Sequence, residues 1–201
     1  MTDVVPHTSL RERKKAKTRT AIRVQALRLF RAQGYDATTV EQIAAAAEVS
    51  PSTFFRYFPA KEDVVLRDDF DDRMFEAFDR QPPSLAPVAA LRAAIREAVA
   101  TLTPAEWAEF QEMSALGLSI PEVRARMLDE MTRTMDMWAG ALAKRVGRPP
   151  DDLAIRVYTG AVFGVIMAVI GPETYAEGAV GLQTFARLDE ALALLEGGLS
   201  L

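Results

Sequence analysis

Residues 49–64 read VSPSTFFRYFPAKEDV, with four aromatic side chains within five positions between two prolines. Ser50 has a side chain suited to capping a helix, and Pro51 fits the first helical position, where its missing N–H costs nothing. Pro59 disfavours helical backbone at the residue before it. The stretch therefore predicts a helix of one to two turns, from Pro51 to about Tyr57.

The aromatic residues of this short helix predict how it is held in place. Phe54 and Phe58 are four residues apart, so they share one face and can pack onto the helices that precede them. Ser52, Thr53 and Arg56 remain free to contact another molecule. We therefore expect an anchored helix that presents polar side chains.

The segments before this helix complete a helix-turn-helix pattern. We expect one helix over residues 10–33, which ends near Gly34, and a second over residues 40–47, which Thr38 or Thr39 caps. The major groove of B-form DNA is about 12 Å wide and admits one helix, whose N-terminal side chains reach the base edges. The pattern therefore favours DNA binding.

Two basic residues of the quoted stretch are candidates for DNA contacts. Arg56 can make a bidentate contact to guanine or a contact to a phosphate, and its residue type does not decide between them. Lys61 begins a helix that we expect over residues 61–80. Its charge adds to that of a helix N-terminus, which attracts phosphate.

The charge of the chain is unevenly distributed. The net charge is −4, but residues 1–66 hold 11 basic and 7 acidic side chains, whereas residues 67–201 hold 13 basic and 21 acidic ones. Residues 11–31 alone hold nine basic residues and one acid. A basic N-terminal part on an acidic body is expected when one end of a protein contacts a polyanion, although a solvated basic helix face would show the same pattern.

The composition excludes several kinds of chemistry. The chain has no cysteine, and His7 is its one histidine, so disulfides, thiolate chemistry and a histidine-based metal site are not expected, nor is any cofactor. The apolar run 157–170 is shorter than the roughly 20 residues that span a bilayer, so a buried helix is expected rather than a membrane span. No apolar signal run is present at the N-terminus, and a cytoplasmic location is expected.

The rest of the chain is also predicted to be helical, because apolar residues recur every three to four positions. Residues 81–87 and 116–120 are predicted breaks, and Asp151 is the expected cap of an apolar helix. The further helices are expected over residues 88–102, from 103 to the break at 116, and over 121–147, 152–170 and 181–196. The sequence therefore predicts an all-α fold, with an N-terminal three-helix head and a C-terminal helical bundle.

Four motifs follow one another in a single register across residues 11–66. They are Thr18-Arg-x₂-Ile22, Ala26-Leu-x-Leu-Phe30, Gly34-Tyr-x₂-Thr38-Thr-Val-x₂-Ile43-Ala and Val49-Ser-x-x-Thr53-Phe-x-x-Tyr57-Phe-x-x-Lys61-Glu-x-Val64. Together they resemble the N-terminal domain of the TetR family of bacterial transcriptional regulators. The resemblance implies a helix-turn-helix DNA-binding domain over residues 1–66, in which residues 1–9 would be a disordered arm.

The resemblance also implies contacts to DNA phosphates. Arg19, Thr38 and Thr39 would bind phosphate, although either threonine could instead cap a helix and Arg19 could be a solvated charge. Many members carry tyrosine where this chain has Phe55, which has no hydroxyl, so Tyr57 is the nearer candidate for that contact. The candidate DNA-binding residues are Arg19, Thr38, Thr39, Ser50, Ser52, Thr53, Arg56, Tyr57 and Lys61.

The C-terminal part more weakly resembles the mycofactocin-regulator subgroup of the same family. The similar segments are residues 87–94, 121–126 and 189–192. Such domains bind a small inducer and dimerise, and some relatives respond to acyl-CoA-type ligands. Residues 67–201 would then form a ligand-binding and dimerisation domain, with the last two helices as the homodimer interface.

Methionine and aromatic side chains gather in the predicted C-terminal helices. Met127, Met131 and Met135 are four residues apart on one helix face, and flexible methionines adapt to irregular shapes. The candidate ligand-binding residues are Trp107, Phe110, Met113, Met127, Met131, Met135, Trp138, Tyr158, Phe163 and Met167. For each of them, ordinary core is the favoured alternative. The low charge of the set favours an apolar or amphipathic ligand, and the resemblance to the subgroup implies an acyl-CoA-like one.

The function that these features favour is a ligand-gated regulator. A homodimer would bind a near-palindromic operator in double-stranded DNA, and the ligand would release it as a repressor. An all-α enzyme or binding protein for a hydrophobic small molecule is the alternative, for which no catalytic residues stand out. A DNA-packaging protein without sequence preference is disfavoured, because the acidic body would be repelled by DNA.

Overall fold

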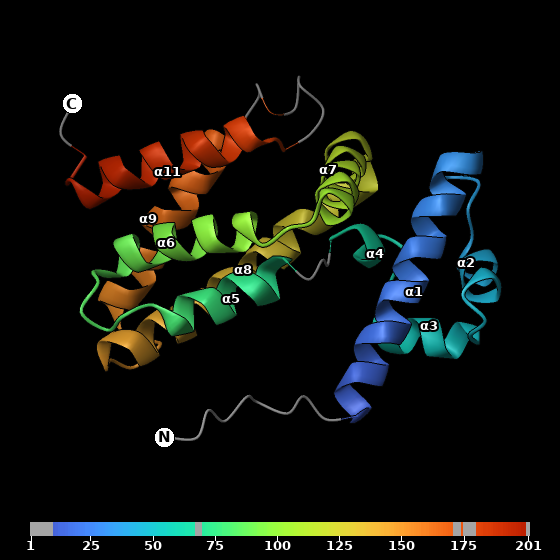
Figure 1. Ribbon diagram of the computed structural model, residues 1–201, viewed down its shortest axis with the longest axis horizontal. Helices are drawn as coiled ribbons and strands as arrows, with labels where there is room; N and C mark the ends of the chain where they lie inside the picture. Colours follow the sequence, from blue (N-terminus) through green and yellow to red (C-terminus); the bar gives the residue numbers. More distant parts are fainter. Residues whose placement is uncertain (1–9, 67–69, 171–173, 175–179, 200–201) are drawn as a thin grey trace. The chain divides into compact units, whose positions relative to one another are not determined.

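The computed structural model describes residues 10–66, 70–170, 174 and 180–199 of the 201-residue chain. Every regular element within these ranges is an α-helix (Figure 1). The predicted all-α fold is therefore confirmed. The chain divides into two compact units, residues 1–65 and 66–201. The predicted arm over residues 1–9 lies outside the described residues.

The N-terminal unit contains three helices that match the predicted ones closely. They are α1 (Leu10–Gln33), α2 (Val40–Ala46) and α3 (Pro51–Tyr57), and α2 contacts both of the others. Apolar side chains from all three helices form a common core, and burial of this apolar surface drives the unit to fold. The most deeply buried of them are Ile22, Ala26, Leu27, Phe30, Ile43, Ala44, Phe54 and Phe58.

The turns between these helices have the chemistry that their residues predict. Gly34 follows α1 with a φ of 84°, a left-handed conformation that glycine adopts without strain. Thr39, rather than Thr38, caps α2: its side chain accepts the N–H of Gln42 at 3.3 Å, and the Gln42 side chain accepts the N–H of Thr39 at 3.0 Å. This reciprocal pair is a capping box.

The helix predicted over residues 61–80 begins later than expected, so its predicted start is wrong. The structure has α4 (Asp63–Leu66) and α5 (Phe70–Arg80), while residues 67–69 lie outside the described part. Helix α4 begins two residues after Lys61. The carboxylate of Asp63 accepts the N–H of Ala60 at 2.9 Å, and this local bond favours a turn before the helix.

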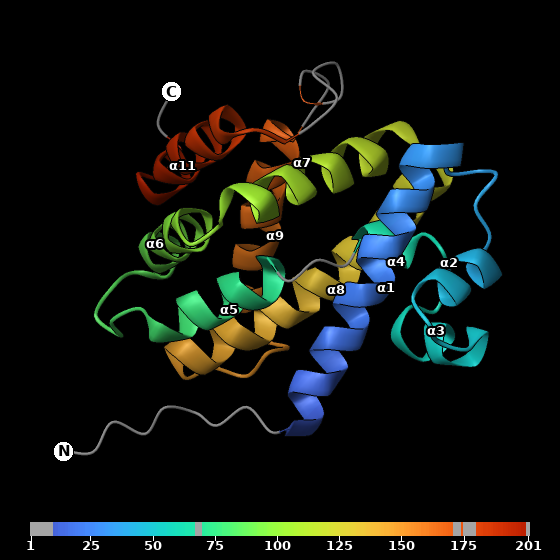
Figure 2. The same cartoon turned by 45° about the vertical axis from the view of Figure 1, so that its right-hand side comes forward.

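The C-terminal unit is a bundle of longer helices. After α5 it comprises α6 (Pro87–Ala100), α7 (Pro104–Ser119), α8 (Pro121–Val146), α9 (Leu153–Val169) and α11 (Leu182–Glu196). Three of these helices begin with proline, whose fixed φ suits a helix start. Helix α6 packs against α5 and α11, and α9 packs against α8 and α11 (Figure 2).

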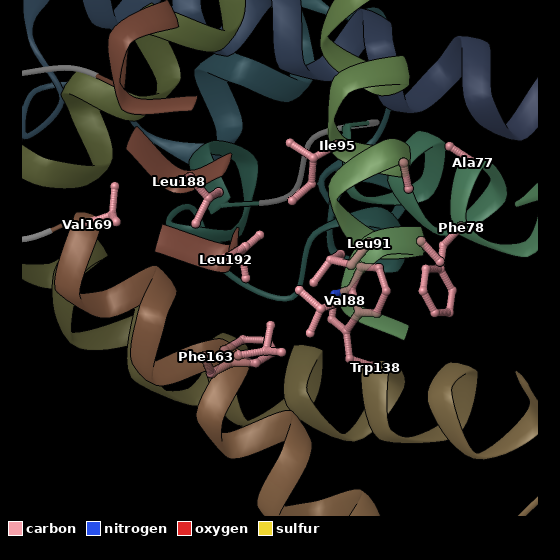
Figure 3. Packing of buried hydrophobic residues seen from close by; sticks show 13 residues of the cluster. Ala77, Phe78, Val88, Leu91, Ile95, Trp138, Phe163, Val169, Leu188 and Leu192 are labelled. Carbon is pink, nitrogen blue, oxygen red and sulfur yellow. The ribbon is translucent and has the colours of Figure 1, made fainter. Parts of the chain in front are cut away.

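The bundle has one main apolar core, to which α5, α6, α8, α9 and α11 all contribute (Figure 3). Trp138 of α8 lies in it and contacts two rings of α5. Phe75 stacks on Trp138 with ring centroids 4.4 Å apart, and Phe78 meets it edge-on at 5.1 Å. Such aromatic pairs add to the stabilisation from buried area.

An ion network on the bundle surface joins α6 to α11. Arg92 donates two hydrogen bonds to Asp189, both at 3.0 Å, and a third to Glu196 at 2.9 Å. Arg96 also donates to Asp189, at 2.8 Å. The hydrogen bond from Arg92 is the main cause of a lowered pKa at Asp189. The network therefore stabilises the packing of α6 against α11 when the Asp189 carboxylate is charged.

Two further boundary predictions are corrected. Helix α7 continues through Ser119, so the predicted break over residues 116–120 is wrong: Gly117 and Leu118 are buried in the bundle and remain helical. The cap of α9 is Asp152 and not Asp151, since its carboxylate accepts the N–H of Ala154 at 2.8 Å. Among the described helices, none is long and apolar enough to cross a membrane.

Candidate functional site

Helix α3 has one buried and one exposed face. Phe54 and Phe58 are 0% exposed, with ring centroids 5.8 Å apart, and they fix the helix to its unit. On the other side, Ser52 and Arg56 are exposed. The sequence prediction of an anchored helix with outward polar residues therefore matches the structure.

Three hydroxyl groups cluster at the start of α3. Ser50 caps the helix by accepting the N–H of Thr53 at 3.1 Å. Its Oγ lies 3.0 Å from the Oγ of Ser52 and 2.9 Å from the Oγ1 of Thr53. The cluster lies at the helix N-terminus, where hydroxyls can donate to or accept from a polar partner.

Arg56 is exposed, and a neighbouring ring restrains it. Its guanidinium carbon lies 5.4 Å from the ring centroid of the half-buried Tyr57, a cation–π contact. The contact reduces the freedom of a long side chain while its N–H donors stay available. The two predicted residues are thus placed together.

Arg19 of α1 lies against the same short helix. Its guanidinium carbon is 5.8 Å from the ring centroid of Phe58, and its Nε is buried without a hydrogen-bond partner. The side chain as a whole is half-buried, so it is packed rather than freely solvated. Its predicted phosphate contact remains a prediction.

The two neighbouring threonines before α2 differ in their surroundings. Thr38 is 1% exposed, and its hydroxyl donates to the carbonyl of Gly34 at 2.7 Å while accepting from Gln33 at 3.2 Å. The hydroxyl of Thr38 is therefore buried and bonded within its own unit, and its predicted phosphate contact remains a prediction. Thr39 is exposed. A backbone hydrogen bond at Glu41, and after it a side-chain hydrogen bond with Thr39, lower the pKa of Glu41.

The amino group of Lys61 is directed back onto its own unit. It donates to the carbonyl oxygens of Tyr35 at 2.9 Å and Thr38 at 3.1 Å, and it lies 3.9 Å from the ring centroid of Tyr35. The Tyr35 hydroxyl in turn donates to Glu62 at 2.9 Å. Lys61 therefore joins the loop before α2 to the turn after α3, a role that its residue type and position in the sequence do not reveal.

Phe55 is the residue of α3 that packing does not account for. Its side chain is 49% exposed, and its ring meets that of Phe54 edge-on, with centroids 5.6 Å apart. It therefore projects from the same short helix as Ser52 and Arg56.

A small cavity lies in the C-terminal unit. Its volume is about 20 Å³, and it is lined by Phe78, Pro87, Leu91, Trp138, Leu142, Tyr158, Thr159 and Val162. The hydroxyl of Thr159 is buried and has no hydrogen-bond partner. Burial raises the pKa of Tyr158, and a backbone hydrogen bond with Val88 offsets part of that rise. The cavity is therefore apolar, with very few polar groups at its wall.

The ten predicted ligand-binding residues do not form one site in this structure. Trp138 and Tyr158 line the cavity. Trp107 and Phe110 belong instead to an aromatic cluster, in which both contact Phe185 with centroids 5.9 Å apart.

The other six candidates lie at different places in the bundle. Met113 and Phe163 are buried, Met131 and Met135 pack at the edge of the main core, Met127 is half-buried, and Met167 is 43% exposed on the outer side of α9. Six residues that line the cavity are not among the candidates from the sequence: Phe78, Pro87, Leu91, Leu142, Thr159 and Val162. Helical spacing could have found two of these, because Leu142 follows Trp138 by four residues and Val162 follows Tyr158 by four.

Comparison with known proteins identifies both units. Residues 22–67 match the family described as bacterial regulatory proteins of the tetR family, and residues 85–200 match the MftR C-terminal domain. The HTH-type transcriptional regulator TcmR of Streptomyces glaucescens is 33% identical over 184 residues, which cover 88% of this chain and 81% of TcmR. This chain belongs to the TetR family of bacterial transcriptional regulators.

Solved structures of TetR-family regulators have the same fold. Thermus thermophilus FadR, a TetR-family repressor in complex with lauroyl-CoA, is 28% identical with a TM-score of 0.56, and the match covers 91% of this chain and 95% of FadR. Bacillus subtilis FadR, in complex with stearoyl-CoA, is 22% identical with a TM-score of 0.51, over 89% of this chain and 98% of that one. The latter similarity shows the fold alone.

The family places this TetR-family protein among DNA-binding transcriptional regulators. Within the described residues, no cluster of three His, Asp or Glu side chains could hold a metal ion.

Proposed function

We propose that this TetR-family protein is a repressor that binds a near-palindromic operator as a homodimer and is released by an apolar or amphipathic ligand. The observation that carries the proposal is the two-faced helix α3. Its aromatic residues are buried, and Ser52 and Arg56 are exposed. A short helix held in this way can enter the major groove without losing its position.

Arg56 and the hydroxyl cluster at the start of α3 would read the operator. Arg56 can donate two parallel hydrogen bonds to a guanine, which is worth about 1–3 kcal/mol of discrimination, or it can donate to a phosphate. Its contact with Tyr57 favours an extended, restrained side chain in either case. Ser52 and Thr53, beside the capping Ser50, would contact base edges or nearby phosphates.

Phosphate contacts around α3 would hold the unit in register. Thr39 is exposed at the start of α2, and Arg19 lies beside α3. Residues 11–31 of α1 carry a net charge of +8, from nine basic residues and one acid. Such contacts supply affinity that falls steeply with salt and carries no sequence information.

The homodimer interface would be formed by the outer faces of α9 and α11. These two helices pack against each other and carry five large exposed apolar side chains. They are Leu153 (75% exposed), Val157 (62%), Met167 (43%), Leu182 (61%) and Leu194 (60%). Gly164 is exposed between them, with open space where a Cβ would stand. A second copy could therefore approach closely, and a two-fold dimer explains why the operator should be a near-palindrome.

The ligand would enter the bundle at the cavity beside Trp138. A volume of about 20 Å³ holds about one water molecule, so a ligand would have to displace side chains. The apolar wall favours an acyl chain or a similar group, and the unpartnered hydroxyl of Thr159 could bond one polar atom of it. The lauroyl-CoA complex of a 28% identical relative supports an acyl-CoA-like ligand.

Ligand entry would be transmitted through α5. Phe78 of α5 rests edge-on against Trp138 and also under Arg145, whose guanidinium carbon is 5.2 Å from its ring centroid. Arg145 donates to three carbonyls of the segment after α5, those of Gln81, Pro82 and Leu85. A ligand that displaces Trp138 would thus disturb α5, which precedes this segment and follows the N-terminal unit along the chain. The ligand shifts DNA binding only if it binds the two conformations with different affinity.

Fluorescence anisotropy with labelled DNA tests the proposal. We expect the full-length protein to prefer a selected operator over a scrambled duplex, and Arg56→Ala to reduce that preference. Arg133→Ala is the charge-matched control, because Arg133 is exposed on α8 of the other unit and should leave the preference unchanged. Lauroyl-CoA should lower operator affinity, whereas CoA alone should not.

Two results would contradict separate parts of the proposal. If the protein shows no operator preference, α3 does not read sequence. If lauroyl-CoA and fatty acids of other lengths bind without changing operator affinity, the gating mechanism is wrong even though the DNA-binding role stands.

A further inference from the structure

Phe55 is an exposed aromatic residue on the helix proposed to enter the groove. Its side chain is 49% exposed, although phenylalanine is among the residues most often buried. In the described part of the N-terminal unit, the large apolar side chains with such exposure are Val24 and Phe55. Packing within the unit therefore does not explain why this position of α3 is aromatic.

The ring of Phe55 is nevertheless held in a defined place. It meets the ring of Phe54 edge-on, with an interplanar angle of 87°, and Phe54 is 0% exposed. Phe54 in turn contacts the buried Phe58. An exposed ring that rests on a rigid base presents a fixed apolar surface at little entropic cost.

This apolar surface adjoins the polar residues of α3. Phe55 is three residues after Ser52, so the two side chains are neighbours on the helix surface, and it directly precedes Arg56. All three are exposed. If Ser52 and Arg56 reach base edges, the Phe55 ring is brought to the same edges.

We propose that Phe55 is a specificity-determining residue whose ring packs against the C5-methyl group of a thymine in the operator. This inference rests on the proposed role of α3 in DNA binding. In the major groove, the thymine methyl is the apolar group that distinguishes a base edge, and phenylalanine is one of the side chains that can contact it. Phe55 has no hydroxyl with which to bind a phosphate, so an apolar partner matches its chemistry.

A protein partner is a poorer match for this surface. The exposed residues near Phe55 along the chain include two apolar ones, Pro51 and Pro59, and two polar ones, Ser52 and Arg56. The ring is therefore not part of a broad apolar patch of the size that protein interfaces need. The thymine methyl requires only a single ring beside hydrogen-bonding groups. This is the arrangement that α3 has.

Replacing thymine by deoxyuridine tests the proposal, because it removes the C5-methyl and leaves the hydrogen-bonding groups of the base unchanged. Wild-type protein is first titrated with a selected operator in which deoxyuridine replaces every thymine. It is then titrated with a set of operators in which one thymine at a time is replaced. One buried methyl group corresponds to about fourfold in affinity, so a dimer that contacts one in each half-site should lose about 15-fold. Phe55→Ala should bind both operators with nearly equal affinity, and Phe55→Tyr, which keeps the ring, should retain the preference for thymine.

The outcomes separate this inference from the proposed function. Unchanged wild-type affinity for the fully substituted operator would overturn the thymine contact, and this measurement needs no variant to fold. A thymine preference that persists undiminished in Phe55→Ala would overturn it as well, because another residue would then contact the methyl. If wild-type protein binds the thymine operator no better than scrambled DNA, the role of α3 itself fails.

Discussion

Replacing Lys61 with methionine should destabilise the N-terminal unit without removing a phosphate contact. The Lys61 amino group donates to the carbonyls of Tyr35 and Thr38 at 2.9 and 3.1 Å. A hydrogen bond from a charged donor contributes about 1.5–3 kcal/mol, and because Lys61 is half-buried we take the lower end for the pair, about 2–3 kcal/mol in total. Methionine keeps an apolar stem over the Tyr35 ring, so the variant isolates the loss of the two hydrogen bonds.

Hydrogen exchange of the α2 and α3 amides measures this loss, because it reports the opening free energy of this unit separately from the bundle. We expect that free energy to fall by about 2–3 kcal/mol. The dependence of operator affinity on salt should keep its slope. A phosphate contact would behave differently: two Lys61 residues in a dimer would account for about 1.8 of the slope, since each released counterion contributes about 0.9. If the salt dependence of operator affinity falls by that amount and hydrogen-exchange protection is unchanged, the internal hydrogen bonds of Lys61 are not its main role. Lys61→Arg, which keeps the charge but not the shape, is the control.

Three further predictions address the bundle. Thr159→Val should raise the free energy of unfolding by about 1 kcal/mol, because it removes a buried hydroxyl without a hydrogen-bond partner. Urea unfolding followed by tryptophan fluorescence measures this change. A clear loss of stability would mean that the hydroxyl does have a partner. Val157→Glu should convert the dimer to a folded monomer, because it places a charge in the proposed interface at a residue that is 62% exposed in the single chain. Analytical ultracentrifugation measures the oligomeric state, and circular dichroism shows whether the variant is folded. A persisting dimer would place the interface elsewhere. The pKa of Glu106 is lowered to about 2, chiefly by the backbone N–H and hydroxyl of Thr103 and then by Arg73, so its stabilisation is complete above pH 4.5 and is lost as the pH falls towards 2. Glu106→Gln should therefore lower the melting temperature at pH 7 but not at pH 2, and an equal difference at both would contradict the cause.

Local chemistry made the helix starts predictable from sequence. Ser50 with Pro51 and Thr103 with Pro104 cap and begin α3 and α7 as expected, because the bonds involved join residues within a few positions of each other. The all-α class follows for a similar reason, since apolar residues repeated at helical spacing throughout the chain. The role of Phe54 as an anchor was also predictable from the sequence, because its spacing from Phe58 places both side chains on one face of the helix.

Features that depend on distant residues were not predictable in the same way. Lys61 and Thr38 both have side chains that suit a phosphate contact, and only the fold shows that they bond to residues of their own unit. The helix expected from residue 61 begins only at Asp63, after a turn that the Asp63 carboxylate stabilises. In the bundle, Met167 has the apolar character of a pocket residue but lies on the outer side of α9. The neighbouring helices determine which face of an apolar helix points outward. The spacing of apolar residues in the sequence does not show whether they belong to the core or to a dimer interface.

Selection of bound DNA from a random pool by the full-length protein tests the central claim most directly. The account predicts an enriched near-palindrome whose half-sites are centred one helical turn, about 10–10.5 base pairs, or a multiple of it apart. It also predicts that Arg56→Ala enriches a site with altered preference at the same position in both halves. A pool without enrichment, or an enriched site without two-fold symmetry, would contradict a dimer that reads DNA through α3.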